Sequence, residues 1–565
     1  MVRDNMASDK HKKSTLRYNL KKLAGFLGIF TRNPRGMLGI VIIAVFGILA
    51  LFPYMFTPYD PVNDIRLSGL YAAPSWLTNF PTDLGGMPDL TSNMNPTANP
   101  DFDSGLTGWN WTAPAHSMVE YVNDVEGHSG VAYLGFRRDE VGVAYGTVTV
   151  DLYQTFYYPY GGEPFSLEGR IACLFNGSVT VSEELVMNLT EGSVVWPIPY
   201  INVTVSTLDV KMQVQAYVEA MAINSSLEIW PLRGYSAYAI KGLENMTGND
   251  VMGTVSGEWV DSSAAQTPIT TYGDSVGKMI VDQFGAAGRK LPIQRFFPSE
   301  ACPGYYKIGF RISFFDVNAS KPVFAGLYLD TMGFRVYGTS WGILGTDHLG
   351  RDLWSQLVYG TKISLYVGLL SSIMAVAIGL VVGLMAGYMG KVVDEFLMRV
   401  CDVLLVLPGL PLLIVLIAVL GASVDNLIIL LGALGWMGFA RLVRSQVITL
   451  KERPFIEAAK AVGASKTHIM FRHILPNVMS LVYVTLATTV PGNIVAEASL
   501  GFLGFSDPNR MSWGLMLDNM QLNQAYRCWW WVIPPGLCIA AIAIAFILFG
   551  YALDEILNPR LRLRR

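Results

Sequence analysis

The sequence predicts an α-helical, polytopic membrane protein of six transmembrane helices that carries an inserted all-β domain. Three observations predict this class. Of the 565 residues, 52% are hydrophobic and only 15% are charged, and the mean hydropathy is +0.37, as is typical of an integral membrane protein with a soluble part. Six stretches are apolar over about the length that a bilayer core requires. A long polar segment rich in strand-forming residues separates the first two of them.

The apolar stretches set the expected domain organisation. The predicted spans are residues 37–56, 363–387, 395–420, 426–445, 477–499 and 530–553. A basic N-terminus (1–36) precedes the first span, and its length, together with the lack of a small-residue cleavage site, argues against a signal peptide. The β-rich domain is expected at 57–340, the core with the other five spans at 341–555, and a basic tail at 556–565.

Lysine and arginine residues predict the orientation of the chain. They concentrate in residues 1–36, in residues 441–473 and in the tail. Basic residues in short loops favour the cytoplasmic side, and six spans place all three segments on one side. We therefore expect a multi-pass protein of the cell membrane with both termini in the cytoplasm and the β-rich domain outside.

Glycosylation sequons support the same orientation. All seven N-x-S/T sequons of the chain fall between the first and second predicted spans. Such clustering indicates a domain exposed outside a cell that glycosylates its surface. The alternative is that an Asn- and Thr-rich β domain generates sequons by composition alone. The candidate acceptors are Asn110, Asn176, Asn188, Asn202, Asn224, Asn245 and Asn318.

The segment between the first two spans is too long for a loop and reads as β throughout. Residues 146–156, 201–214 and 306–315 alternate apolar and polar side chains, and Gly, Pro and Asn clusters separate such runs. Its start (99–112) and its end (327–338) resemble the two ends of jelly-roll, galactose-binding-like domains. This resemblance implies a jelly-roll-like sandwich. Domains of this kind often bind carbohydrate through exposed aromatic side chains, here Trp109, Trp111 or Tyr157, although aromatic residues in a sandwich are more often core.

Five cysteines carry little chemistry. Cys173 and Cys302 lie in the β-rich domain and could form one disulfide, which their spacing alone does not establish. Cys401 and Cys538 lie in predicted spans and are expected to be plain apolar side chains. Cysteine and histidine residues nowhere have metal-ligand spacing, so no metal site is predicted.

Two patterns stand out inside the predicted spans. Gly379, Gly383 and Gly387 recur every four residues, which predicts close approach of a neighbouring helix. Polar residues within a span indicate either a water-filled translocation path or hydrogen bonds between helices, and the sequence leaves both open. The candidates for the path are Asp402, Thr485, Thr488, Thr489, Asn493 and Glu497.

The segment Glu457–Asn477 is polar and partly basic, and it lies between two apolar stretches. Its opening, Glu457-Ala458-Ala459, is a strong helix start. The helix is expected to break at Gly463, and a second helix should end near Pro476, where the next span begins. The segment is thus predicted to form two helices joined by a hinge on the cytoplasmic face, where another molecule binds it.

This segment resembles the signature E-A-A-x3-G-x9-I-x-L-P of permeases of ATP-binding-cassette (ABC) importers. His473 stands at the position of the family's Ile, as is common in the peptide branch. Residues 344–369 and 497–517 resemble two further elements of dipeptide and oligopeptide permeases, with Gln356 in place of Arg and Gly501 in place of Ser. The leader FTRNPRGMLG, followed by TPYDP, fits the second-permease type. The resemblance covers about 280 residues, and the long β insert departs from the family plan.

The resemblance implies a type I ABC importer fold and a transport subunit without chemistry of its own. The chain has no G-x-x-x-x-G-K-[ST] phosphate loop, so ATP and magnesium would bind to two separate ATPase subunits and no cofactor to this chain. A paralogous permease would complete a heterodimer within membrane lipid, an extracellular binding protein would deliver substrate, and nucleic acid is not expected. By resemblance, the residues that couple to the ATPase are Glu457, Ala458, Ala459, Gly463, Leu475 and Pro476.

Two alternatives remain at this point. The first keeps the importer and changes its cargo from peptides to oligosaccharides or nickel. The second is a membrane-anchored surface protein that binds carbohydrate through the β-rich domain. It would need only one span and would leave the Glu457–Asn477 segment without a purpose.

Overall fold

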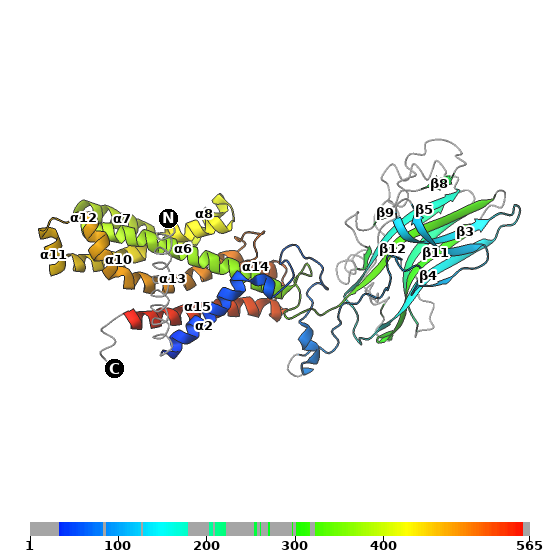
Figure 1. Ribbon diagram of the computed structural model, residues 1–565, viewed down its shortest axis with the longest axis horizontal. Helices are drawn as coiled ribbons and strands as arrows, with labels where there is room; N and C mark the ends of the chain where they lie inside the picture. The colour runs from blue at the N-terminus through cyan, green and yellow to red at the C-terminus, as the bar shows by residue number, and fades with distance from the viewer. Residues whose placement is uncertain are drawn as a thin grey trace, which may run out of the picture. The chain divides into compact units, whose positions relative to one another are not determined.

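The computed structural model describes residues 33–82, 86–125, 128–178, 203–206, 210–221, 254–256, 260–261, 269–271, 297, 301–316 and 322–557. The chain divides into two compact units (Figure 1). The helical unit takes in Met1–Leu67 and Asp347–Arg565, and the β unit is Ser68–Thr346. Residues 83–85 and the termini lie outside the described part, as do the candidate glycosylation sites Asn188, Asn202, Asn224, Asn245 and Asn318.

The β unit begins at Ser68, not at residue 57 as expected. The reason is local, because residues 57–67 bond to the segment that leads into the next helix. The backbone N–H groups of Arg66 and Leu67 donate to the carbonyls of Leu349 and Gly350, each at 2.9 Å. The Thr57 hydroxyl bonds to the Ser355 hydroxyl. The linker after the first span is therefore part of the helical unit.

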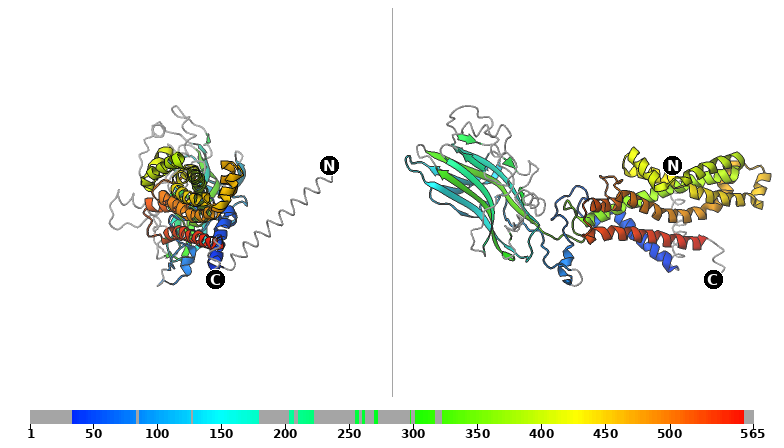
Figure 2. Two further views of the ribbon diagram at one scale, coloured as in Figure 1. Left: turned by 90° about the vertical axis from the view of Figure 1, so that its left-hand side faces the viewer. Right: turned by 180° about the vertical axis from the view of Figure 1, so that it is seen from behind.

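The helical unit is built on long apolar helices, which Figures 1 and 2 show from three sides. In the described residues, five helices are long and apolar enough to cross a membrane, and a bent pair makes a sixth span only if it is counted as one. The elements are α2 (Pro34–Leu51), η1 (Pro53–Met55), α6 (Leu353–Met389), α7 (Lys391–Val406), α8 (Gly409–Leu420), α9 (Val424–Leu434), α10 (Met437–Lys451), α11 (Pro454–Ala461), α12 (Lys466–His468), η6 (Ile469–Ile474), α13 (Leu475–Phe502), α14 (Trp513–Leu522) and α15 (Trp529–Leu557).

The second and third spans differ from their predicted form. The second begins at Leu353, not at residue 363, because the side chain of Asp352 caps the helix by accepting from the Ser355 N–H at 2.8 Å. The third is not one helix over 395–420. It bends by 88° between α7 and α8, because Leu407 is extended (ψ 136°) before Pro408, where the proline ring disfavours the helical conformation.

The helix α6 packs closely on α10 along its glycine stripe, as predicted. A Cβ atom built at Gly379 would lie 2.8 Å from the carbonyl oxygen of Trp436, and one at Gly383 would lie 2.6 Å from that of Ala440. At Gly387 it would lie 2.7 Å from Val447 Cβ. The absence of side chains at these positions therefore sets the distance between the two helices.

Replacement of Gly383 by leucine is expected to destabilise the helical unit by about 1–3 kcal/mol, because the new side chain has to push two helix backbones apart. The measurement is the thermal midpoint of the purified chain in detergent. Gly438→Leu is the matched control, since it lies on α10 with no atom within 4 Å of a Cβ built there. Equal midpoints for the two variants would contradict this account of the packing.

The β unit consists of two antiparallel sheets. One has the strand order β1-β4-β11-β7-β6, and the other has the order β10-β5-β12-β3-β2, with β8 and β9 also paired to β5. A short helix, η2 (Ser75–Asn79), precedes them. The strands are β1 (Asn110–Thr112), β2 (Ser117–Val125), β3 (His128–Arg138), β4 (Gly146–Tyr158), β5 (Ser166–Ser178), β6 (Val203–Ser206), β7 (Val210–Ala220), β8 (Thr254–Ser256), β9 (Val260–Asp261), β10 (Ile269–Thr271), β11 (Gly304–Asp316) and β12 (Val323–Tyr337).

Aromatic side chains between the two sheets form the core of the β unit. The ring centroids of Phe136 on β3 and Phe314 on β11 lie 5.5 Å apart, and those of Phe310 and Phe334 lie 5.9 Å apart. The alternation predicted for residues 146–156 appears as alternate burial along β4. Two sheets in face-to-face contact make this unit a β sandwich.

For Trp109 and for Cys302 the structure decides against a possibility that the sequence left open. Trp109 is not an exposed platform, because its side chain is 3% exposed and its Nε1 donates to the Asn99 carbonyl at 3.0 Å. Trp111 and Tyr157 are exposed, at 46% and 49%. Cys302 is a free thiol and not half of a disulfide with Cys173. Its Sγ lies 3.1 Å from the Tyr306 hydroxyl, at the start of β11.

Candidate functional site

The segment predicted to be read by another molecule is a pair of short helices between α10 and α13. The helix α11 begins at Pro454, before Glu457, so Glu457 lies within its first turn and does not open it. A proline is tolerated at the first helical position because its missing N–H would be unpaired there. Ala458 and Ala459 follow Glu457 on the same helix, and Leu475 and Pro476 begin α13.

Gly463 ends α11 in a left-handed conformation, with φ +86°. Its N–H donates to the Lys460 carbonyl at 3.0 Å, and the next N–H, of Ala464, donates to the Ala459 carbonyl at 3.1 Å. These two bonds form a Schellman motif, which satisfies carbonyls that the end of a helix otherwise leaves free. The predicted break at Gly463 is therefore a built turn of fixed geometry, not a loose hinge.

The inner side of the segment belongs to the hydrophobic core of the helical unit. Ile456, Ile469 and Ile474 are buried at 0–1% exposure. They share a cluster with Val447 of α10 and Tyr388 at the end of α6. Burial of these apolar side chains fixes the helix pair on the ends of two long helices. A displacement of the pair must therefore move α6 and α10 or break this cluster.

The outer side of the segment is exposed and partly apolar. Val462 is 89% exposed, Phe471 is 62% exposed and Phe455 is 44% exposed. Glu457 is also exposed, and within the described part of the chain no ion pair involves its carboxylate. An exposed group of large apolar residues beside charged ones is typical of a protein–protein interaction surface.

Two of the three threonines predicted for the translocation path bond to their own helix through their hydroxyls. The Thr488 hydroxyl donates to the Thr485 carbonyl at 3.0 Å, and the Thr489 hydroxyl donates to the same carbonyl at 2.8 Å. Thr488 is exposed, and Thr485 and Thr489 are half-buried. The hydroxyls of Thr488 and Thr489 are thus satisfied without a neighbouring helix, which leaves part of α13 open for another contact.

Asn493 and Glu497, further along α13, instead join helices together. The Asn493 amide donates to the hydroxyls of Ser371 and Ser372 on α6, at 2.8 and 2.9 Å. The Glu497 carboxyl group, only 1% exposed, accepts from the Ser364 hydroxyl at 2.9 Å. For these two residues the structure favours hydrogen bonding between helices over an open path.

Asp402 lies apart from the other predicted path residues. It forms an ion pair with Arg441 of α10, and both side chains are about half exposed. About two turns earlier on α7, Asp394 makes a bidentate ion pair with Arg444, in which Arg444 Nη2 lies 2.6 Å from Asp394 Oδ2. These pairs tie α7 to α10, so Asp402 belongs to a link between helices and not to the polar side of α13.

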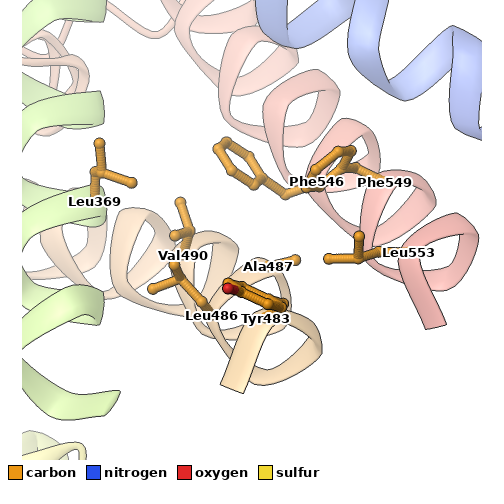
Figure 3. A pocket seen from close by; sticks show the side chains of 8 residues that line it. All are labelled: Leu369, Tyr483, Leu486, Ala487, Val490, Phe546, Phe549 and Leu553. Atoms are coloured by element: carbon orange, nitrogen blue, oxygen red, sulfur yellow. The ribbon is translucent and has the colours of Figure 1, made fainter. Parts of the chain in front are cut away.

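A cavity of about 540 Å³ opens between α6, α13 and α15 (Figure 3). The figure shows aliphatic and aromatic side chains from all three helices around it, and the Tyr483 hydroxyl is the one oxygen among the side chains drawn. The polar residues of α13 that predict a path do not line it. The lining residues are Leu369, Tyr483, Leu486, Ala487, Val490, Phe546, Phe549 and Leu553.

A buried carboxylate organises the segment that leads into α6. Asp347 is 0% exposed. Its Oδ1 accepts from the backbone N–H groups of Leu349 and Arg351, at 2.8 and 3.0 Å. Its Oδ2 accepts from Arg351 Nε at 2.7 Å and from Gln356 Nε2 at 2.8 Å. Gln356, which replaces the expected Arg, thus still supplies a donor to this carboxylate. The motif at 344–369 is recognisable in the sequence, but the sequence does not show that Asp347 accepts hydrogen bonds from Arg351 and Gln356.

His348 and Gly501 lie in the two other segments that resemble the family, 344–369 and 497–517. Burial lowers the pKa of His348, so its imidazole is neutral near pH 7, and its ring stacks on Trp531 with centroids 5.9 Å apart. Gly501, the other departure from the expected motif, packs against α14. A Cβ built at Gly501 would lie 2.7 Å from the Cα of Gly514, so a serine would not fit without a shift.

Comparison with known proteins identifies relatives of the chain. Residues 379–563 match the family described as binding-protein-dependent transport system inner membrane component. The dipeptide transport system permease protein DppC of Bacillus subtilis (strain 168) is 36% identical over 219 residues, which cover 39% of this chain and 68% of that protein. The chain belongs to this family. The oligopeptide transport system permease protein OppC of the same organism is 36% identical over 220 residues, or 72% of its length.

In this permease, the family match takes in the end of α6 and everything from α7 to α15, including the helix pair at Gly463. Among solved structures, inward-facing conformations of the MetNI methionine ABC transporter are similar at a TM-score of 0.29 and 20% identity, over 37% of this chain and 96% of that chain. The β unit, Ser68–Thr346, lies outside the residues that match the family.

Proposed function

We propose that this permease moves peptides across the cell membrane by alternating access, as one of two membrane subunits of an ABC importer. The observation that carries this proposal is the helix pair around Gly463, whose inner side is core and whose outer side is exposed. Membership of the family, and the peptide transport systems named for its relatives, support the cargo class. The chain would be a transport subunit and not an enzyme.

The topology that we propose has six spans, with α7 and α8 counted as one broken span. Both termini and the helix pair lie in the cytoplasm, and the jelly-roll-like β unit lies outside. The distribution of lysine and arginine supports this orientation. The clustering of sequons in the β unit supports it independently.

In the proposed mechanism, the outer side of α11 and its Schellman turn sits in a groove of a separate ATPase subunit. Glu457 binds a basic group there, and the small side chains of Ala458 and Ala459 let the two surfaces approach. When ATP draws two ATPase subunits together, each pulls on one permease. Because Ile456 and Ile469 are core residues, the pull reaches α6 and α10 directly.

The cargo then passes between this permease and a paralogous partner. An extracellular binding protein delivers it when the two subunits open outward. The part of α13 around Thr488, which is exposed, is the part of the predicted path that would face the partner subunit. Asn493 and Glu497 hold α13 on α6 during the switch, through their hydrogen bonds to serine hydroxyls.

Co-purification of ATP-binding subunits tests this proposal. The full-length chain, extracted in mild detergent from its own cells, is expected to retain ATPase subunits, and Glu457→Lys is expected to lose them. Glu452→Lys is the matched control, because Glu452 is an exposed acid just before α11. Failure of the unmodified chain to retain an ATPase, or equal loss in both variants, would overturn the coupling role. Titration of the cognate binding protein with peptides, oligosaccharides and Ni²⁺ then decides the cargo.

A further inference from the structure

A second cavity, of about 590 Å³, lies near the beginning of α6 and differs in chemistry from the apolar one. Three parts of the helical unit line it: the loop that follows η1, two turns of α6, and the segment just before α14. Its volume lies within the range of small-molecule sites. The polar and aromatic lining residues that matter here are Asp60, Tyr359, Lys362, Tyr366, Asn509 and Arg510.

Both cations of this cavity are available to a ligand. Lys362 is exposed, and no carboxylate oxygen in the described residues lies within 4 Å of its ammonium group. Arg510 is held only loosely, with Nε 4.0 Å from Asp507 Oδ2 and a side chain that is 49% exposed. Asp507 Oδ1 in turn accepts from the Asn509 N–H at 3.0 Å. Two positive charges therefore face the cavity, and no carboxylate in the described part of the chain pairs closely with either of them.

The one acid that lines the cavity is engaged elsewhere. Asp60 Oδ1 accepts from the backbone N–H groups of Val62 and Asn63, at 2.8 and 2.7 Å. The bond from the Asn63 N–H lowers the pKa of Asp60 below its ordinary value, so the carboxylate stays charged and holds the turn. It therefore shapes the wall of the cavity and does not neutralise Lys362 by contact.

We propose that this cavity binds a carboxylate group through Lys362 and Arg510. A guanidinium offers two parallel donors to a carboxylate, an ammonium adds a point charge, and tyrosine hydroxyls can complete the hydrogen bonds. The inference rests on the proposed function, which puts this end of α6 on the outer side. The carboxylate would come either from the free C-terminus of a peptide cargo or from a surface side chain of the binding protein.

The exposed side of α6 connects this cavity to the apolar one. Tyr366 lines the polar cavity, and Leu369, about one turn further along α6, lines the apolar cavity. Both residues are 44% exposed. A peptide held by its carboxylate at Lys362 would thus lie beside a surface that suits apolar side chains. If Lys362 only reached toward lipid headgroups, no such neighbouring surface would be needed.

Saturation-transfer NMR on the full-length chain in lipid nanodiscs tests the cargo source. Trialanine is expected to give a signal and its C-terminal amide a signal at least about tenfold weaker, since the amide lacks the negative charge that Lys362 and Arg510 would bind. Lys362→Met and Arg510→Gln should each remove the difference between the two probes. Arg527→Gln is the matched control, because Arg527 is exposed before α15 and does not line the cavity.

The second source is tested in the reconstituted transporter. If the binding protein supplies the carboxylate, Lys362→Met should raise the concentration of loaded binding protein that gives half-maximal ATP hydrolysis by about tenfold, which corresponds to 1.4 kcal/mol. Arg527→Gln should leave this concentration unchanged. Absence of both effects, or equal effects from Arg527→Gln, would overturn the carboxylate site.

The two hypotheses fail in different measurements. Loss of the coupling role would appear as failure to retain an ATPase, with the NMR difference between the two probes intact. Loss of the carboxylate site would appear as equal signals from both probes together with an unchanged half-maximal concentration in Lys362→Met, with ATPase retention intact.

Discussion

Replacement of Gly463 by proline is expected to abolish uptake and substrate-stimulated ATP hydrolysis, while the chain still inserts into the membrane. Gly463 has φ +86°, whereas proline is fixed near −65°. Proline also lacks the N–H that donates to the Lys460 carbonyl in the turn. The cost at this turn is about 3 kcal/mol or more, and it falls on the surface that we assign to the ATPase.

Graded substitutions at the same position separate conformation from side-chain size. Asparagine tolerates a positive φ better than other side chains, so Gly463→Asn should retain most activity, and Gly463→Ala should lie between asparagine and proline. Uptake by the reconstituted transporter and insertion into membranes are measured side by side. Normal transport by the proline variant would refute the role of this turn.

Replacement of Asp347 by alanine is expected to destabilise the helical unit by about 3–5 kcal/mol, because it leaves the buried Arg351 without its anion. The Arg351 side chain is only 8% exposed, and Asp347 also accepts from two backbone N–H groups. The measurement is thermal unfolding of the purified chain in detergent, with an expected fall of about 10 °C in the midpoint.

An exposed ion pair provides the control for this second prediction. Asp139 pairs with Arg137 at 2.9 Å, but these side chains are 71% and 63% exposed. Exposed pairs contribute about 0–1 kcal/mol, so Asp139→Ala should leave the midpoint nearly unchanged. If Asp347→Ala were equally mild, the network around Asp347 would not hold the beginning of α6.

The sequence predicted the parts of the fold that depend on local pattern. The period-four glycines predicted the contact of α6 with α10, because a missing side chain is the cause of the close approach. The alternation of apolar and polar residues over 146–156 predicted β4, because successive side chains of a strand point to opposite faces of its sheet. The family's motifs located the helix pair, and Gly463 marked its turn.

Features that depend on a distant partner could not be predicted in this way. Asp402 lies in a predicted span like Asn493, but Arg441 draws it to α10. Trp109 and Trp111 are two residues apart, and only the packing of the sandwich buries one and exposes the other. The cavity at Lys362 joins three segments that lie far apart in the chain, so no single motif contained it.

The length of α6 has a mechanical consequence. Its 37 residues span about 55 Å, well beyond a hydrocarbon core of about 30 Å. One end is anchored by the Asp352 cap and the Asp347 network, and the other ends in the cluster that holds Ile456. A rod without an internal break cannot absorb a displacement at one end. Force applied at the ATPase surface would therefore reach the cargo side as a tilt of α6 as a whole.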